Sequence, residues 1–187
     1  GFAKKIILLG DKEKIYKNAV SLGVSIKDIV IINPDNSEKK EEYSLLYFQL
    51  RRDKDITADF AEETIKNPLF FGSMMIRQGD ADAMVAGAMN TTANVVRAGL
   101  QIIGMSSNET LVSSCFMMIV PDCPYGENGI LAFADAGIVP DPNPQQIAHI
   151  AAATANTFRI LTGHKPIVAM LSFSTKGSAK HKMIDKV

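Results

Sequence analysis

The segment from Gly79 to Gly104, GDADAMVAGAMNTTANVVRAGLQIIG, most constrains the fold of this 187-residue chain. Its first part, residues 81–88, is a short apolar run between turn-forming residues, which favours a buried strand over a helix. The second part has apolar side chains at helical spacing, with Asn90 or Thr91 placed to cap its start and Gly104 placed to end it. The sequence therefore predicts a strand, a turn of small residues and a helix.

The start of that helix is a candidate anion site. A helix that begins at the carboxyl end of a strand offers free backbone N–H groups to a negative charge. Asn90, Thr91 and Thr92 lie at this start, and Arg97 on the second turn adds a fixed positive charge nearby. Units of this kind are common in α/β proteins and most of them bind nothing there. The residues alone leave both a folding unit and an oxyanion pocket open.

Composition excludes several classes of protein. The chain has 20 basic and 20 acidic side chains, and this zero net charge argues against nucleic-acid or membrane-surface partners. There is no run of eighteen apolar residues and no charged-then-apolar leader, so a soluble, cytoplasmic protein is expected. Cys115 and Cys123 make no disulfide framework, and with three scattered histidines they make no zinc site.

Strands and helices alternate in the first half, which predicts a parallel sheet. The expected elements are strands at 3–9 and 28–32 and helices at 11–23, 37–52, 58–66 and from Pro68 onward. Regularity is lost at residues 105–110, the expected boundary between a first domain at 1–107 and a second at 108–187. The chain begins just before a predicted strand and ends within a charged run, so a fragment of a longer protein is expected.

The second half is expected to contain strands at 111–120 and 129–134, joined by a turn, a helix at 143–161 and a final strand at 167–172. A loop rich in serine, glycine and lysine follows at residues 174–180. Backbone N–H groups in such a loop can form a nest for phosphate, although a plain strand-to-helix connection is the more common role.

The residue pattern of the central segment resembles that of the phosphate acetyltransferase (phosphotransacetylase) family. That family carries a Gly-Asp-x-Asp-Gly-Met-Val-x-Gly-Ala strand, a polar turn and then x-Arg-x-x-x-Gln-Ile-Ile. The matching residues here are Gly79, Asp80, Asp82, Met84, Val85, Gly87, Ala88, Arg97, Gln101, Ile102 and Ile103. Residues 42–51 resemble its Glu-Tyr…Phe-Tyr-Glu-Leu-Arg string, and residues 168–180 fit its Val-Ala-Met-Leu-Ser-x-Ser-Thr-Lys-Gly-Ser-Ala-Lys at nearly every position. The resemblance runs from about residue 3 to the end.

The resemblance implies an architecture and a reaction. The expected fold is α/β, with two three-layer α/β domains, a mostly parallel sheet and an active-site cleft between the domains, as in isocitrate and isopropylmalate dehydrogenases. The implied reaction is reversible acetyl transfer between acetyl phosphate and coenzyme A, which gives acetyl-CoA and inorganic phosphate. Coenzyme A is then a substrate, and no tightly bound cofactor or metal is needed. A homodimer is also implied, for which the helix at 147–161 could supply the interface.

The resemblance also implies site residues. An arginine matching Arg51 belongs to the active site of the family, and Arg97 is the second expected catalytic residue. Arg52 falls where the family has lysine and is expected to be a surface charge; without the resemblance, both Arg51 and Arg52 would be read as cations at a helix end. The residues expected to bind substrate are Asn90, Thr91, Thr92, Cys123, Ser174, Thr175, Lys176, Gly177 and Ser178.

The chain departs from the family pattern in one major respect. Nothing in it matches the family's Asn-Asp-Leu-Ser-Arg-Gly segment, which supplies the serine, the arginine and a nearby aspartate thought to orient the thiol. The family's first strand–helix unit has no counterpart either. Asn90 and Asn94 stand where the family often has histidine and aspartate. The chain alone is therefore expected to hold the anion-binding half of the site and to be inactive.

Three alternatives differ in the reaction. A phosphate butyryltransferase would share the motifs and differ in pocket size, whereas a non-catalytic acyltransferase-like domain of a larger enzyme would make no thioester. An oxidoreductase of the isocitrate-dehydrogenase type is disfavoured, because no Gly-x-Gly-x-x-Gly follows a strand and no metal-binding aspartate cluster is evident. Thioester synthesis without nicotinamide would separate the acyltransferases from the other two.

Overall fold

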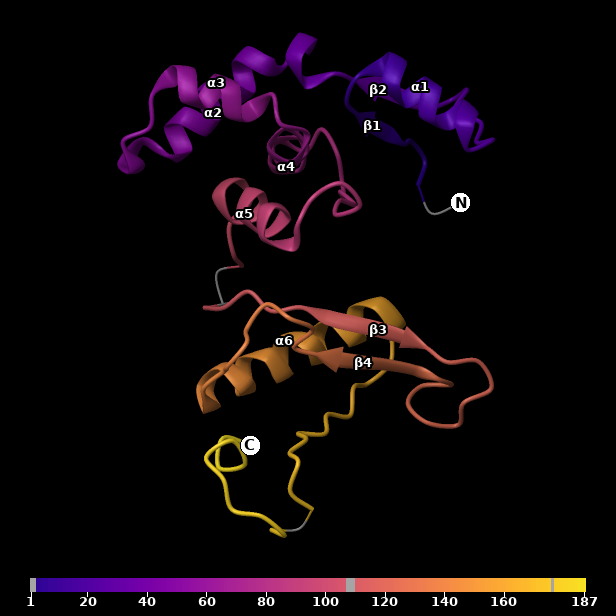
Figure 1. Ribbon diagram of the computed structural model, residues 1–187, viewed down its shortest axis with the longest axis vertical. Coiled ribbons are helices and arrows are strands. Elements are labelled where there is room, and N and C mark those ends of the chain that lie inside the picture. Colours follow the sequence, from indigo (N-terminus) through magenta and orange to yellow (C-terminus); the bar gives the residue numbers. More distant parts are fainter. Residues whose placement is uncertain (1–2, 107–109, 176) are drawn as a thin grey trace. The chain divides into compact units, whose positions relative to one another are not determined.

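A computed structural model describes residues 3–106, 110–175 and 177–187, and it shows an α/β protein (Figure 1). The chain divides into two compact units, Gly1–Gly104 and Met105–Val187. The first unit contains β1 (Ile7–Leu9), α1 (Lys12–Ser21), β2 (Val30–Ile32), the 3₁₀ turn η1 (Pro34–Asn36), α2 (Lys40–Leu50), the 3₁₀ turn η2 (Arg52–Lys54), α3 (Ala58–Ile65), α4 (Pro68–Gln78) and α5 (Thr92–Ile102). The second contains β3 (Cys115–Ile119), β4 (Ile130–Ala134) and α6 (Pro144–Thr162).

A β–α–β unit opens the first half, as the sequence predicts. β1 and β2 pair in parallel, with Ile7 opposite Val30 and Leu9 opposite Ile32. A parallel pair needs a crossover connection, which α1 provides. Asp11 starts this helix by accepting a hydrogen bond from the Lys14 backbone N–H at 2.8 Å.

Helices α2 to α5 enclose the core of the first unit. Helices α2 and α3 lie side by side, and α4 packs against α5 (Figure 1). Thr57 caps α3, and Asn67 caps α4 with Pro68 at its first turn, so both starts follow the predicted residues. The core consists of side chains from all four helices: Tyr43, Tyr47, Ala61, Ile65, Phe71, Met74, Met75 and Ile102.

A hairpin and one long helix form the second unit. β3 and β4 are antiparallel, with Cys115 opposite Ala134 and Ile119 opposite Ile130. Gly129 is required just before β4, because its φ is +85° and a Cβ there would lie 2.0 Å from the Val120 carbonyl oxygen. Helix α6 lies along β4 (Figure 1) and begins with a capping box formed by Asn143 and Gln146.

Two predicted strands are absent from the described residues. Residues 81–88 form no ladder and are mostly exposed, and Val85 has its whole side chain in solvent. Residues 167–172 are also outside any ladder, with Ile167 97 % exposed. The prediction of strands from these apolar runs is wrong because a strand needs a neighbour for its N–H and C=O groups, and neither run forms ladder hydrogen bonds with a described strand.

The sheets differ from the expected three-layer arrangement. The α/β class is confirmed, but the described residues form two separate two-stranded sheets, of which only β1–β2 is parallel. The connection from β3 to β4 contains no helix, so the two strands fold back as a hairpin instead of running in parallel. The predicted turn between strands 111–120 and 129–134 is therefore confirmed, although a mostly parallel sheet in this unit is not.

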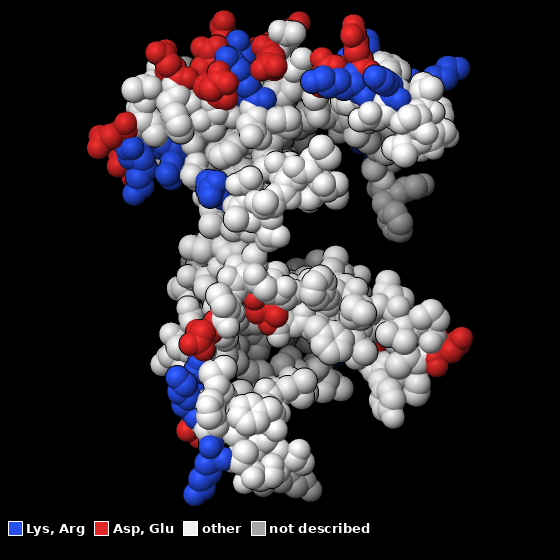
Figure 2. Space-filling view, in the orientation of Figure 1, with Lys and Arg blue, Asp and Glu red and all other residues white. Residues whose placement is uncertain are grey.

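Charges of both signs are mixed on the face of the protein shown in Figure 2. Acidic and basic side chains lie close together over the first unit, and several form ion pairs. Lys40 pairs with Glu62 at 3.1 Å, and Lys66 pairs with Glu63 at 2.7 Å. This mixing agrees with the equal numbers of acidic and basic residues in the sequence.

Candidate functional site

A buried hydrogen bond joins the two helices that carry the predicted catalytic arginines. Tyr47 of α2 donates its hydroxyl to Oε1 of Gln101 on α5, with 2.7 Å between the oxygens. The Tyr47 side chain is 2 % exposed, and its ring meets Phe70 edge to face. Burial raises the pKa of Tyr47, and the positive charge of Arg51 acts in the opposite direction. The arginine charge therefore acts on the Tyr47 hydroxyl.

Arg51 ends helix α2. Its backbone N–H donates to the carbonyl oxygens of Tyr47 and Phe48 at 3.1 and 3.2 Å. The side-chain Nε is buried and has no hydrogen-bond partner among the described residues. A buried donor without a partner carries a free-energy cost of about 1–3 kcal/mol. The guanidinium therefore keeps hydrogen-bonding capacity that a bound anion could use.

Arg97 lies on the second turn of α5 and is exposed. Its Nη1 donates to Oδ1 of Asn94 at 3.0 Å, so the side chain leans toward the start of the helix. No acidic side chain of the described residues pairs with Arg97, in contrast to Lys40 and Lys66 of the same unit.

The start of α5 has free backbone donors, although the strand predicted before it is absent from the described residues. Thr91 is the capping residue and accepts from the Asn94 backbone N–H at 3.3 Å. The backbone N–H groups of Thr92 and Ala93 donate to no described residue, and the helix dipole makes this end positive. Asn90 is half-buried in the turn just before the cap. Asn90, Thr91 and Thr92 therefore lie at the start of α5, and Arg97 lies on its second turn.

Replacing Thr91 with alanine should lower the free energy of unfolding by about 1 kcal/mol, because the first turn of α5 loses its side-chain cap. Urea unfolding of the variant would measure this change. Thr92→Ala is the matched control: the Thr92 hydroxyl bonds no described residue, and alanine is favoured inside a helix. Equal destabilisation by both changes would contradict the capping role.

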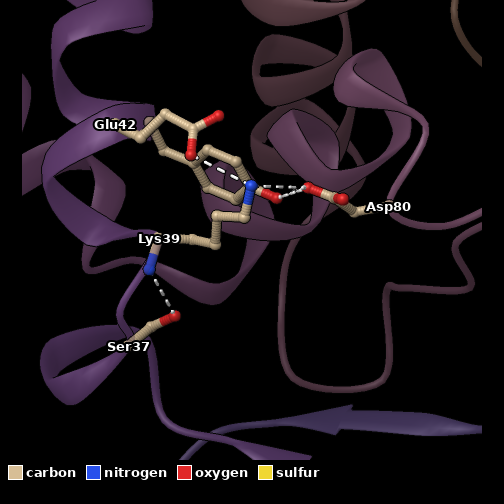
Figure 3. A network of polar contacts seen from close by, with 5 residues as sticks. Ser37, Lys39, Glu42 and Asp80 are labelled. Carbon is tan, nitrogen blue, oxygen red and sulfur yellow. Dashed lines mark hydrogen bonds and ion pairs between the residues drawn. The ribbon is translucent and has the colours of Figure 1, made fainter.

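A second polar network ties α2 to the end of α4 (Figure 3). The Tyr43 hydroxyl donates to Asp80 Oδ2, while Lys39 bridges Glu42 at 3.0 Å and Asp80 at 3.9 Å. Burial raises the pKa of Tyr43, and the hydrogen bond to Asp80 adds to the rise. Neither Tyr43 nor Tyr47 is among the site residues expected from the sequence. Buried tyrosine hydroxyls nearly always have a partner, so both could have been recognised as polar links.

The remaining predicted site residues belong to the second unit. Cys123 is a free, half-buried thiol in the connection between β3 and β4. In the serine-rich loop, the Ser174 hydroxyl accepts from the Ala179 N–H at 3.1 Å, and the Ser178 hydroxyl accepts from the Thr175 N–H at 3.2 Å. Gly177 takes a φ of +75° in the turn, and Lys176 lies outside the described residues. The two serine hydroxyls therefore stabilise the conformation of the loop.

Asp135 is a carboxylate with a structural role, which the sequence did not single out. One oxygen accepts from the backbone N–H of Ser114 at 2.7 Å, and the other from those of Gly137, Ile138 and Val139 at 2.7–2.9 Å. Burial acts to raise its pKa, but these four donors hold the pKa far below the usual value. Asp135 thus fastens the end of β4 to the segment before β3.

A cavity of about 660 Å³ lies in the second unit between β4, α6 and residues 165–171. Its walls are mainly apolar, and none of the predicted site residues described by the structure lines it. Within the described part of the chain, no group of histidine, cysteine, aspartate and glutamate side chains is arranged to hold a metal ion. None of the described helices is long and apolar enough to span a membrane.

The structure defines an α/β protein, and its sequence motifs resemble those of an acyltransferase family. Residues 1–187 match the model of the phosphate acetyl/butaryl transferase family, so the chain belongs to that family. It is 46 % identical over 182 residues to phosphate acetyltransferase from Thermoanaerobacterium thermosaccharolyticum and 44 % identical over 183 residues to that from Clostridium acetobutylicum. These matches cover 97–98 % of this chain and 55 % of each relative.

Solved structures of phosphotransacetylases have a similar fold. The fold is similar to the EutD phosphotransacetylase from Staphylococcus aureus, with a TM-score of 0.80 and 36 % sequence identity, covering 97 % of this chain and 54 % of that one. A phosphotransacetylase from Streptococcus pyogenes gives the same TM-score and identity over 98 % of this chain. The chain thus spans about half the length of the relatives that it matches.

Proposed function

We propose that the chain is part of a phosphate acetyltransferase and contributes residues that bind the phosphoryl end of acetyl phosphate. The observation that carries this proposal is the pair of arginines without acidic partners among the described residues, Arg51 with a buried, unpaired Nε and Arg97 at the start of α5. Their helices are joined by the Tyr47–Gln101 hydrogen bond. Membership of the family supports the same reaction.

The reaction assigns a task to each group. The sulfur of the coenzyme A thiolate attacks the acetyl carbonyl carbon; a C–S bond forms, the bond from that carbon to the phosphoryl oxygen breaks, and inorganic phosphate leaves. The thiol proton passes to a base or to water. Arg51 and Arg97 offer planar, permanently charged donors that suit bidentate contact with the phosphoryl oxygens. They would neutralise the charge that builds up on the leaving phosphate.

The groups that activate the thiol have no candidates in this chain, which contains no Asn-Asp-Leu-Ser-Arg-Gly segment. The proposal therefore assigns phosphate binding to the chain and expects no turnover from it alone. We also propose a domain boundary near residue 107, a cleft between two domains, Cys123 and residues 174–178 at the substrate, a cytoplasmic location and a homodimer. Ile160 and Leu161 of α6 are more than 60 % exposed, which supports an interface on this helix.

The family description also covers butyryl transfer, which remains the second candidate. The names of the relatives at 44–46 % identity favour acetyl transfer. Both candidates use the same phosphoryl end, so the arginine assignments do not depend on the acyl group.

The test combines a thioester assay with a binding measurement on this chain. The thioester assay follows acetyl-CoA formation from acetyl phosphate and coenzyme A. The binding measurement uses calorimetry with inorganic phosphate. We expect no turnover, phosphate binding by the unaltered chain, and loss of that binding in Arg97→Ala. Absence of phosphate binding would overturn the proposal. Turnover abolished by Arg97→Ala would show that the missing segment is dispensable for thiol activation.

A further inference from the structure

We propose that Tyr47 is a positioning residue: through its hydrogen bond to Gln101 it holds Arg51 in register with Arg97, so that both guanidiniums reach one phosphoryl group. This inference rests on the proposed function, because it assumes that the two arginines bind the same anion. It concerns a residue that does not itself touch the ligand.

The register follows from helical spacing. Tyr47 and Arg51 are four residues apart at the end of α2, and Arg97 and Gln101 are four residues apart on α5. Residues four apart lie on the same face of a helix, one turn from each other. Each arginine therefore lies one turn from a partner in the hydrogen bond that joins the two helices at 2.7 Å.

The Tyr47 ring is fixed in place by its surroundings. It is 2 % exposed, and its ring centroid lies 5.8 Å from that of Phe70 with the planes at 79°. The hydroxyl cannot move away from Gln101 unless the ring leaves the core. Because burial keeps the hydroxyl neutral, Tyr47 does not form an ion pair with Arg51, whose charge stays available for a ligand.

Tyr43 provides a matched comparison one turn earlier on α2. Its side chain is 1 % exposed and its hydroxyl also makes one hydrogen bond, but the acceptor is Asp80 at the end of α4. Tyr43→Phe and Tyr47→Phe therefore remove the same atom from similarly buried sites. Only the second change breaks the link between the helices of Arg51 and Arg97.

The experiment measures phosphate affinity by calorimetry and stability by urea unfolding for the unaltered chain and both phenylalanine variants. We expect Tyr47→Phe to weaken phosphate binding roughly tenfold, which corresponds to about 1.4 kcal/mol. Tyr43→Phe should lose comparable stability and keep its phosphate affinity within about twofold. Gln101→Met removes the acceptor of the Tyr47 hydroxyl without adding a charge, and it should weaken phosphate binding as Tyr47→Phe does.

A double-mutant cycle distinguishes a positioning role of Tyr47 from a general loss of packing in the first unit. In an Arg51→Met background, Tyr47→Phe should cause no further loss of phosphate affinity, because the residue that it positions is gone. Normal affinity in Tyr47→Phe, or the same loss in both phenylalanine variants, would overturn the inference. If phosphate binding depends on Arg51 and Arg97 but not on Tyr47, the proposed function stands without it. If the unaltered chain binds no phosphate, the proposed function itself fails.

Discussion

Replacing Asp135 with asparagine is expected to lower the free energy of unfolding by about 3 kcal/mol, because charge-assisted hydrogen bonds contribute about 1.5–3 kcal/mol each and several are weakened together. The Asp135 carboxylate accepts from four backbone N–H groups and from the Ser114 hydroxyl. An asparagine side chain has one acceptor oxygen and brings an NH₂ group that faces donors. Urea unfolding at neutral pH measures the change.

Asp141→Asn is the matched control for this change. The Asp141 carboxylate is mostly exposed and makes one surface ion pair, with Lys186. Exposed pairs contribute little, so the control variant should lose far less stability than Asp135→Asn. Similar losses in the two variants would show that Asp135 is not a special anchor.

The pH dependence of stability should also reflect the role of Asp135. The pKa of Asp135 is lower in the folded chain than the ordinary value of about 4, so its stabilising contribution is complete above that value. The contribution is then lost as the pH falls below about 4 toward the depressed folded pKa. Stability of the unaltered chain should therefore decline across this acid range more steeply than that of Asp135→Asn, which has no carboxyl group to protonate at this position.

The starts of five of the six described α-helices could be predicted from local signals, and α2, which has no side-chain cap, is the exception. Asp11, Thr57, Asn67, Thr91 and Asn143 each begin a helix at or within a residue of the predicted start, because a capping side chain satisfies N–H groups within its own first turn. Such a signal needs no information from elsewhere in the chain.

The two missing strands show the limit of that reasoning. Residues 81–88 and 167–172 have the composition of buried strands, yet the hydrogen bonds of a strand come from a neighbour that composition does not identify. The β3–β4 hairpin was predicted correctly because its partners adjoin in sequence across a turn that contains Gly126 and Gly129.

For the candidate site, too, local features could be predicted from the sequence and long-range contacts could not. Thr91, Thr92 and Arg97 belong to one predicted helix and its cap, so the sequence could place them on the same short element. The link from Tyr47 to Gln101 spans 54 positions and depends on helix packing, so no local pattern predicted it. The link from Asp135 to Ser114 was missed because the two residues are 21 positions apart and become neighbours only when the hairpin forms, whereas the donors at residues 137–139 are local.

Replacing Arg51 with methionine is expected to weaken phosphate binding roughly 10- to 100-fold. The lost contact is a charge-assisted hydrogen bond from the guanidinium, which contributes about 1.5–3 kcal/mol. Methionine keeps the length and apolar packing of the arginine stem, and it removes the buried Nε that has no partner among the described residues. The protein should therefore stay folded, with unchanged or slightly raised stability. Calorimetry with inorganic phosphate and urea unfolding would measure both quantities.

Arg52→Met is the control that makes this prediction specific. Arg52 adjoins Arg51, carries the same charge and is exposed in η2 without a hydrogen bond to a described residue. Both variants lower the net charge by one, so any loss of long-range attraction is shared, and at physiological ionic strength such attraction is screened beyond about 8 Å. A large loss confined to Arg51→Met would identify a directional contact, and Arg51→Lys should then retain part of the affinity because the charge remains while the planar fork is lost. Equal losses in Arg51→Met and Arg52→Met would instead mean that phosphate is attracted by general positive charge, and the assignment of Arg51 to the site would be wrong.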